Sequence, residues 1–154
     1  MDELYKLFRL YTRIKTKRRC FIMKNHFYCP KCQCYLDIED KLIFAVKSPG
    51  GNRGLVALSP ELGDYNVKTN PHFNVEKGKK YEFFCPVCNT ELASEVNENL
   101  THLHMVDQKN NEYEVMFSKI AGEQSTYTLI GENVSMYGED SGNYIDFINL
   151  SSVK

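Results

Sequence analysis

Two ten-residue units with nearly the same pattern place the strongest constraint on the fold of this chain. FYCPKCQCYL covers residues 27–36 and FFCPVCNTEL covers residues 83–92, and both follow aromatic-aromatic-Cys-Pro-x-Cys-x-x-x-Leu. Zinc in structural sites takes four thiolate or imidazole ligands in a tetrahedron, commonly two from each of two tight turns. The sequence therefore predicts one structural Zn²⁺ bound by the four cysteines of the two units. They are Cys29, Cys32, Cys85 and Cys88.

The turn that follows each cysteine pair carries a further expectation. Proline after the first cysteine fixes φ there, and the residue after the second cysteine often needs a left-handed conformation, for which glycine is the usual choice. Gln33 and Asn89 stand at that position, and Asn tolerates the left-handed region better than Gln does. The sequence thus predicts two similar knuckles that close on one metal, with Leu36, Leu92 and the preceding aromatic residues packed around it.

The CPKC and CPVC motifs resemble the paired knuckles of the zinc-ribbon group, and the layout around them is similar to that of small bacterial zinc-ribbon-type proteins. The similarity covers residues 27–36 and 83–92 closely and the rest of the chain only loosely. It implies a mostly β, zinc-ribbon-like fold with a hairpin and a turn-rich segment inserted between the knuckles, since 52 residues separate Cys32 from Cys85. Zinc ribbons bind nucleic acid, dock proteins or brace enzymes, so the resemblance leaves the function open.

Other chemistries compete for the same cysteines. A rubredoxin-like iron centre also uses two C-x-x-C pairs and would imply electron transfer, so Fe is the alternative to Zn²⁺. Thiol redox chemistry needs one C-x-x-C at a helix start in a βαβ setting, and the sequence predicts no such setting. Cys34 aligns with Thr90 of the second unit, at a position not expected to face the metal, and is interpreted as a free thiol. Cys20 receives no role.

Composition agrees with a globular chain in a reducing compartment. The 154 residues are 42% hydrophobic and 25% charged, which is enough for one domain with a core, or one domain with an appendage. Six cysteines are about 4% of the chain, below the roughly 8–10% of disulfide scaffolds. No apolar run approaches the roughly 18–20 residues of a membrane span, and no signal-peptide core is found. The sequence predicts a cytoplasmic protein.

Residues 1–22 form a basic N-terminal segment ahead of a zinc-ribbon-containing β domain at residues 23–154. The segment has seven Lys/Arg and two acidic residues, which gives it a net charge of +5, whereas residues 23–154 have a net charge of −6. Its apolar residues recur at helical spacing, which predicts an amphipathic helix, with a frayed tail as the other interpretation. The first six residues, MDELYK, match the C-terminal end of green fluorescent protein, and Met23 opens MKNHFYCPKC. A third interpretation is therefore that residues 1–22 are a cloning or start-site artefact.

Hydrophobic alternation predicts antiparallel strands beyond the knuckles. KLIFAVK (41–47) and GLVALS (54–59) flank a tip rich in Pro and Gly, and THLHMVD (101–107) and EYEVMFSKI (112–120) flank the turn residues QKNN. Each pair predicts a hairpin.

Shorter elements complete the predicted fold. NHFYC and YEFFC lead into the cysteine pairs and predict strands, as do STYTLIGE and NVSMYG. The segment 59–80 contains two prolines and two glycines and predicts turns with short extended pieces. LASEVNENL (92–100) predicts a short helical turn, and the closing NYIDFINL predicts a strand or a helical turn.

Four histidines are candidate ligands outside the cysteine set. His102 and His104 alternate on a predicted strand, so both face the same way and could bind a second metal or act as a general base. An ordinary exposed strand face is the other interpretation. His26 precedes Cys29 by three residues and could substitute as a ligand, although the four-cysteine set is complete. His72 lies in a predicted turn.

Two further stretches contain residues that could contact a ligand or a partner. SPGGNRG lacks the lysine and hydroxyl of a phosphate-binding loop and is interpreted as a hairpin tip, whose Arg53 can contact an anion or a partner. Acidic and aromatic residues interleave near the C-terminus, which favours a solvated face or a surface for a basic protein partner. They are Glu132, Glu139, Asp140, Asp146, Tyr137, Tyr144 and Phe147.

The favoured function is a non-enzymatic protein-interaction or adaptor module with a structural Zn²⁺, since no nucleophile elbow, zincin motif or persuasive triad is present. The first alternative is nucleic-acid binding through residues 13–31, and the second is electron transfer through bound iron. The predicted phosphate contacts of the first alternative are Arg13, Lys15, Lys17, Arg18, Arg19, Lys24 and Lys31.

Overall fold

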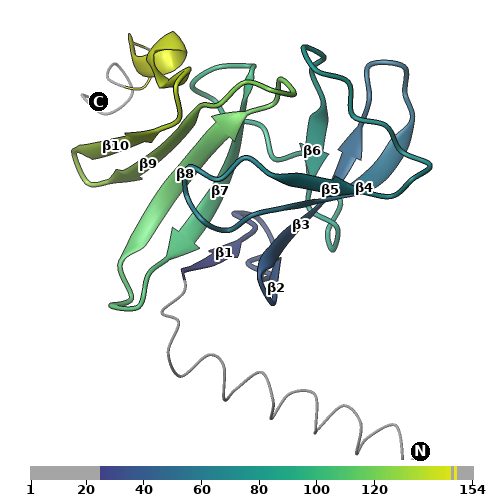
Figure 1. Ribbon diagram of the computed structural model, residues 1–154. Coiled ribbons are helices and arrows are strands. Elements are labelled where there is room, and N and C mark those ends of the chain that lie inside the picture. The colour runs from purple at the N-terminus through teal and green to yellow at the C-terminus, as the bar shows by residue number, and fades with distance from the viewer. Residues whose placement is uncertain (1–24, 147, 149–154) are drawn as a thin grey trace, which may run out of the picture.

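The computed structural model describes residues 25–146 and 148, and within them the chain forms two antiparallel β-sheets of five strands each (Figure 1). The first sheet has the order β1-β7-β8-β9-β10. Its strands are β1 (His26–Tyr28), β7 (Leu100–Val106), β8 (Glu112–Ser118), β9 (Thr126–Ile130) and β10 (Asn133–Tyr137). The predicted mostly β fold is confirmed.

The second sheet runs β2-β3-β4-β5, and β6 pairs with the free side of part of β3. Its strands are β2 (Asp37–Ile38), β3 (Lys41–Lys47), β4 (Arg53–Leu58), β5 (Val67–Thr69) and β6 (Glu82–Phe84). Both predicted hairpins are confirmed, as β3 with β4 and as β7 with β8. Residues 59–80 contain turns and the single short strand β5, as the prolines and glycines predicted.

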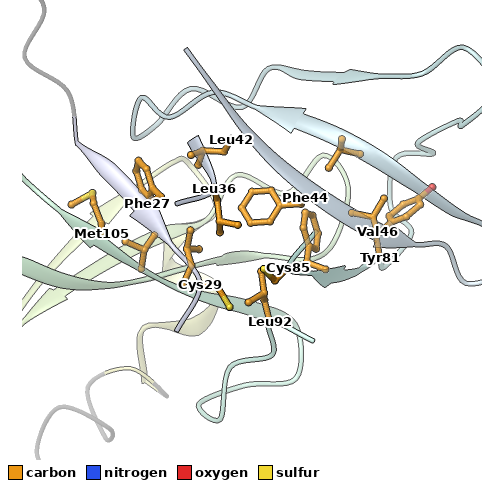
Figure 2. Close-up of a cluster of buried hydrophobic side chains, with 14 of the residues drawn as sticks. Phe27, Cys29, Leu36, Leu42, Phe44, Val46, Tyr81, Cys85, Leu92 and Met105 are labelled. Atoms are coloured by element: carbon orange, nitrogen blue, oxygen red, sulfur yellow. The ribbon is translucent and has the colours of Figure 1, made fainter. Parts of the chain in front are cut away.

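The main core lies between the two sheets. Burial alternates along β3, where Leu42, Phe44 and Val46 are buried while their neighbours are not, so one face of the strand points inward. Leu103 and Met105 of β7 belong to the same cluster from the other sheet, and Figure 2 shows much of this cluster, with Cys29 and Cys85 inside it. The cysteines are therefore part of the hydrophobic core that joins the sheets.

A second, smaller core covers part of the opposite face of the first sheet. It contains Leu100, Met116, Tyr127 and Leu129, and the chain end packs on it through Tyr144 and the buried Ile148. The end begins as a 3-10 helix, η1 (Ser141–Tyr144), so the helical alternative predicted for NYIDFINL is the correct one.

The helical turn predicted for residues 92–100 is wrong. Leu92 and Ala93 are extended, since the backbone of Leu92 bonds to Phe83 and Ala93 pairs with Thr101. Leu100 N then donates to Asn97 O at 3.1 Å in a tight turn that feeds directly into β7. Pairing with the neighbouring strands β6 and β7, which propensity does not report, decides the conformation of this segment.

No helix among the described residues is long and apolar enough to cross a membrane. The predicted basic helix at residues 1–22 lies outside the described residues, as does Cys20. The division of the chain at residue 23 likewise stays a prediction.

Candidate metal centre

The first knuckle is a tight turn that closes on its own sulfur atoms. Gln33 N donates to Cys29 O at 2.9 Å, and Cys29 N donates to Cys34 O at 3.0 Å. Lys31 N lies 3.4 Å from Cys29 Sγ, so the backbone also wraps around the first sulfur. These bonds reverse the chain direction at Gln33. Its φ is 61°, which is the predicted left-handed conformation.

The second knuckle repeats the backbone–backbone bonds of the first. Asn89 N donates to Cys85 O at 2.9 Å, Cys85 N donates to Thr90 O at 2.9 Å, and Cys88 N lies 3.5 Å from Cys85 Sγ. Asn89 has a φ of 60°. The leucine at the end of each unit makes the same backbone bond. Leu36 N donates to Phe27 O and Leu92 N donates to Phe83 O, both at 2.8 Å. The repeat in sequence is thus a repeat in backbone geometry.

The four cysteine sulfurs converge. All four Sγ atoms lie within 4.8 Å of one another, and two pairs that join the knuckles, Cys29 with Cys88 and Cys32 with Cys85, are each separated by 3.7 Å. A zinc–thiolate bond of about 2.3 Å in a tetrahedron places neighbouring sulfurs about 3.8 Å apart. The cluster can therefore accommodate one metal ion of this size without rearrangement.

Each knuckle crosses from one sheet to the other, and the two cross in opposite directions. The first enters from β1 of the first sheet and leaves into β2 of the second, while the other enters from β6 of the second sheet. It leaves toward the first sheet, where Ala93 pairs with Thr101 and His102 N donates to Leu92 O at 3.0 Å. A metal ion held by both knuckles would therefore tie the two sheets together.

A partly buried ion pair ties the sheets beside the second knuckle. Lys119, directly after β8, has a side chain that is only 3% exposed, and its Nζ lies 2.9 Å from Glu82 Oε2 on β6. Burial raises the pKa of Glu82, but its hydrogen bonds with Glu91 and Lys119 outweigh burial and hold that pKa below its usual value. The pair is a second link between the sheets that needs no metal.

The thiols of the cluster differ in their electrostatics. Cys29 and Cys85 are fully buried, and burial raises the pKa of both, that of Cys85 to about 12. In contrast, the hydroxyl of Thr90 lies 3.2 Å from Cys88 Sγ and lowers the pKa of that thiol to about 6. A cation at the centre would favour the thiolate form of all four, since metal ligation requires deprotonated sulfur.

The other residues named from the sequence fall outside the cluster, with one exception. Cys34 is a free thiol that points to Tyr35 O at 3.4 Å, and the His26 ring pairs with Asp37 at 2.9 Å. The exception is Thr90, which aligns with Cys34 and whose hydroxyl lies 3.2 Å from Cys88 Sγ, so that it contacts a sulfur of the cluster. This contact is a hydrogen bond.

The C-terminal acidic and aromatic residues do not form one exposed surface. Asp140 Oδ2 accepts a bond from Gln124 N at 2.9 Å, and Tyr144 is buried in the second core. Phe147 lies outside the described residues. Part of this stretch is thus used to close the fold.

Fold and site together define a two-sheet β protein whose sheets are linked by paired knuckles carrying a four-cysteine cluster that suits a metal ion. No family model, curated protein or solved structure matches this chain in the three comparisons made. The membership of the zinc-ribbon group therefore rests on the knuckles themselves and stays a prediction.

Proposed function

We propose that this protein is a non-enzymatic adaptor module, in which the knuckles hold one structural Zn²⁺ and the outer face of the second sheet binds a protein partner. The observation that supports docking at this face is a continuous apolar centre within a basic rim. Side chains that alternate with the buried ones point away from the core, and they define the outer face. Its apolar members are Ile43, Ala45, Leu55, Ala57 and Phe84.

The register places these residues side by side. Ala45 of β3 lies between Phe84 of β6 and Leu55 of β4, which forms one apolar row across three strands. Ile43 lies opposite Ala57 in the next row. Leu55, at the β4 end of the first row, is 55% exposed. Exposed apolar surface framed by polar residues is typical of protein-binding sites.

Positive side chains frame most of the apolar rows; Glu82 of β6, which lies on the same face opposite Lys47, adds one carboxylate, and this carboxylate is paired with Lys119. Lys41 and Lys47 lie at the two ends of β3, and Lys68 lies opposite Ala57 on β5. The Arg53 guanidinium lies 4.8 Å from the centre of the Phe84 ring, where the cation–π contact holds it at the rim. The partner proposed for this face therefore has acidic groups around an apolar centre.

The second knuckle borders the same face, which is how the metal would serve the function. Arg53 Nη2 donates to Asn89 Oδ1 at 3.0 Å, and Phe84 directly precedes Cys85. Val87, inside the knuckle, is 65% exposed. A metal that fixes the knuckle would fix Arg53 and Phe84 as well, so zinc would act as a brace for the docking surface.

The test compares partner capture by three forms of the protein. The substitution Leu55→Ser removes the most exposed apolar side chain of the proposed surface, and Met136→Ser makes a matched change on β10, where Met136 is 50% exposed. We expect a defined protein to be retained by the wild type and by Met136→Ser, to be lost with Leu55→Ser, and to dissociate with added salt. A partner retained equally by all three forms would place the interaction elsewhere and contradict the proposal.

One described residue favours nucleic-acid binding as a second candidate function. Lys31 is exposed in the first knuckle, whereas the other predicted phosphate contacts lie outside the described residues. A salt-titrated binding assay on the chain with and without residues 1–22 separates the alternatives. Equal, negligible affinity of both forms for nucleic acid would remove this candidate, and a steep salt dependence lost with residues 1–22 would favour it over the adaptor.

A further inference from the structure

We propose a second metal site, in which His102, His104 and Glu114 bind one divalent transition-metal ion on the first sheet. His102 and His104 lie on β7 and point to the face opposite the main core, since Leu103 between them is buried in that core. Glu114 lies on β8 directly opposite His104. Strand alternation and register therefore bring three potential ligands, two imidazoles and one carboxylate, to one spot.

The distances suit an ion. One ligand atom from each residue lies within 4.8 Å of the other two, and His102 Nε2 is 3.6 Å from Glu114 Oε1. Zinc bonds to nitrogen and oxygen of about 2.0–2.2 Å in a tetrahedron place neighbouring donors about 3.4 Å apart. The separation of 3.6 Å is too long for a hydrogen bond between the two groups but close to the separation that a bridging metal imposes.

The surroundings hold the ligands in position. The backbone N–H of His102 is bonded to Leu92 O, and the backbone of His104 pairs with Tyr28. The Tyr28 ring packs edge-on against the His104 ring with centroids 5.3 Å apart, and the two histidine rings lie 5.2 Å apart. Rings fixed by packing lose little freedom when a metal binds.

Charge and protonation fit the same role. Burial disfavours the charged form of the His102 ring and so lowers its pKa. Glu114 supplies a negative charge, and Glu95 acts on His102 electrostatically from a second carboxylate. Two imidazoles and one carboxylate are a donor set that suits zinc and other late first-row divalent ions.

The site differs in kind from the cysteine cluster. Three protein ligands leave one coordination position to water, and Glu114 is largely exposed, so exchange with solvent is open. The cysteine cluster is closed by four sulfurs, two of them fully buried. The second ion should therefore bind more weakly and exchange faster than the first.

The test titrates Co²⁺ and Zn²⁺ into the full chain, with the cysteine cluster followed separately. Thiolate-to-cobalt charge transfer reports the sulfur cluster, whereas nitrogen and oxygen ligands give only weak visible bands. We expect a second equivalent of metal to bind without further thiolate absorbance. His102→Ala and Glu114→Gln should each weaken this second event at least tenfold.

Matched controls lie on the same elements or share the residue type. Glu112→Gln changes a carboxylate two residues away on the same strand, and His72→Ala removes a histidine in an exposed turn, so neither should alter the second event. Histidine ring NMR signals of the wild type give a check without variants: those of His102 and His104 should shift with the second equivalent, and those of His26 and His72 should not. Saturation at one metal per chain, or equal losses with Glu112→Gln and Glu114→Gln, would overturn the proposal.

Discussion

Gln33 and Asn89 occupy the same position in the two knuckles and share the same left-handed backbone, with φ of 61° and 60°. The Asn89 side chain has a further contact, because its Oδ1 accepts a bond from Arg53, whereas no such bond is found for Gln33 among the described residues. The two residues therefore adopt the same left-handed backbone conformation, but only the Asn89 side chain gains a hydrogen bond there.

Glycine at these positions should have different effects. Gln33→Gly relieves the steric cost of a left-handed non-glycine residue, so we expect the free energy of unfolding to rise by up to about 1 kcal/mol. Asn89→Gly gains less, because Asn tolerates this region, and it loses the bond to Arg53. Urea unfolding of the metal-loaded variants measures both. A larger gain for Asn89→Gly than for Gln33→Gly would contradict the strain argument.

Removal of the metal should unfold the link between the sheets. Structural zinc contributes roughly 10–16 kcal/mol of apparent free energy at neutral pH, comparable with the whole stability of a domain. We expect chelation or Cys85→Ser to abolish cooperative thermal unfolding followed by circular dichroism, and Cys34→Ser to preserve it. An unchanged melting temperature after complete metal removal would show that the core alone holds the fold.

The identity of the metal is read from elemental analysis and a visible spectrum on protein purified without added metal or chelator. For the proposed structural site we expect zinc and no colour. About one iron per chain with a red-brown spectrum, which arises from thiolate-to-iron charge transfer, would instead establish the electron-transfer alternative.

Thr101 offers a stabilising substitution. Its side chain is fully buried on β7, and its hydroxyl has no hydrogen-bond partner among the described residues. Thr101→Val keeps the shape and removes the unsatisfied group, so we expect a gain of about 1 kcal/mol in the free energy of unfolding. The matched change Thr126→Val removes a hydroxyl bonded to Tyr65 at 2.8 Å and should cost about the same amount. A lower free energy of unfolding in both variants would mean that the Thr101 hydroxyl has a hydrogen-bond partner in solution.

Tyr144 should make the fold sensitive to alkali. Burial and then the neighbouring Glu123 carboxylate raise its pKa from 10.0 to about 12. The folded chain thus keeps a proton that the unfolded chain loses, so this contribution is intact below pH 10 and is lost as the pH rises toward 12. Relative to Tyr144→Phe, the free energy of unfolding of the wild type should fall by on the order of 2–3 kcal/mol between pH 10 and pH 12. Denaturant unfolding of both forms at each pH measures the difference, and a pH-independent difference would contradict the assignment.

Local patterns sufficed to predict much of the fold. Alternation in KLIFAVK and in the stretch from His102 to Met116 reports which side chains meet the core, and the turn residues between strands report where the chain reverses. The cysteine spacing likewise predicted the left-handed residues at Gln33 and Asn89. Each of these features depends on a few neighbouring residues.

Features that depend on distant partners could not be predicted. At each knuckle the chain passes from one sheet to the other, and β1 pairs with β7 while β6 pairs with β3. No periodic pattern in the sequence indicates this pairing. Glu114 was missed as a companion of the two histidines because it becomes their neighbour only through the register of β7 and β8. The segment 92–100 was predicted wrongly because Leu92 and Ala93 pair with the neighbouring strands on either side of it, and the composition of the segment does not report this pairing.

The distance between the two knuckles has a consequence for synthesis. Cys32 and Cys85 are separated by 52 residues, and at about 5–20 residues per second the second pair of thiols follows the first by roughly 3–10 seconds. During that interval the nascent chain has only half of the four-cysteine set, with the thiol of Cys34 beside it. Metal capture, oxidation and chaperone binding then compete for the same exposed sulfurs, so the cellular supply of zinc would influence the yield of folded protein as well as its stability.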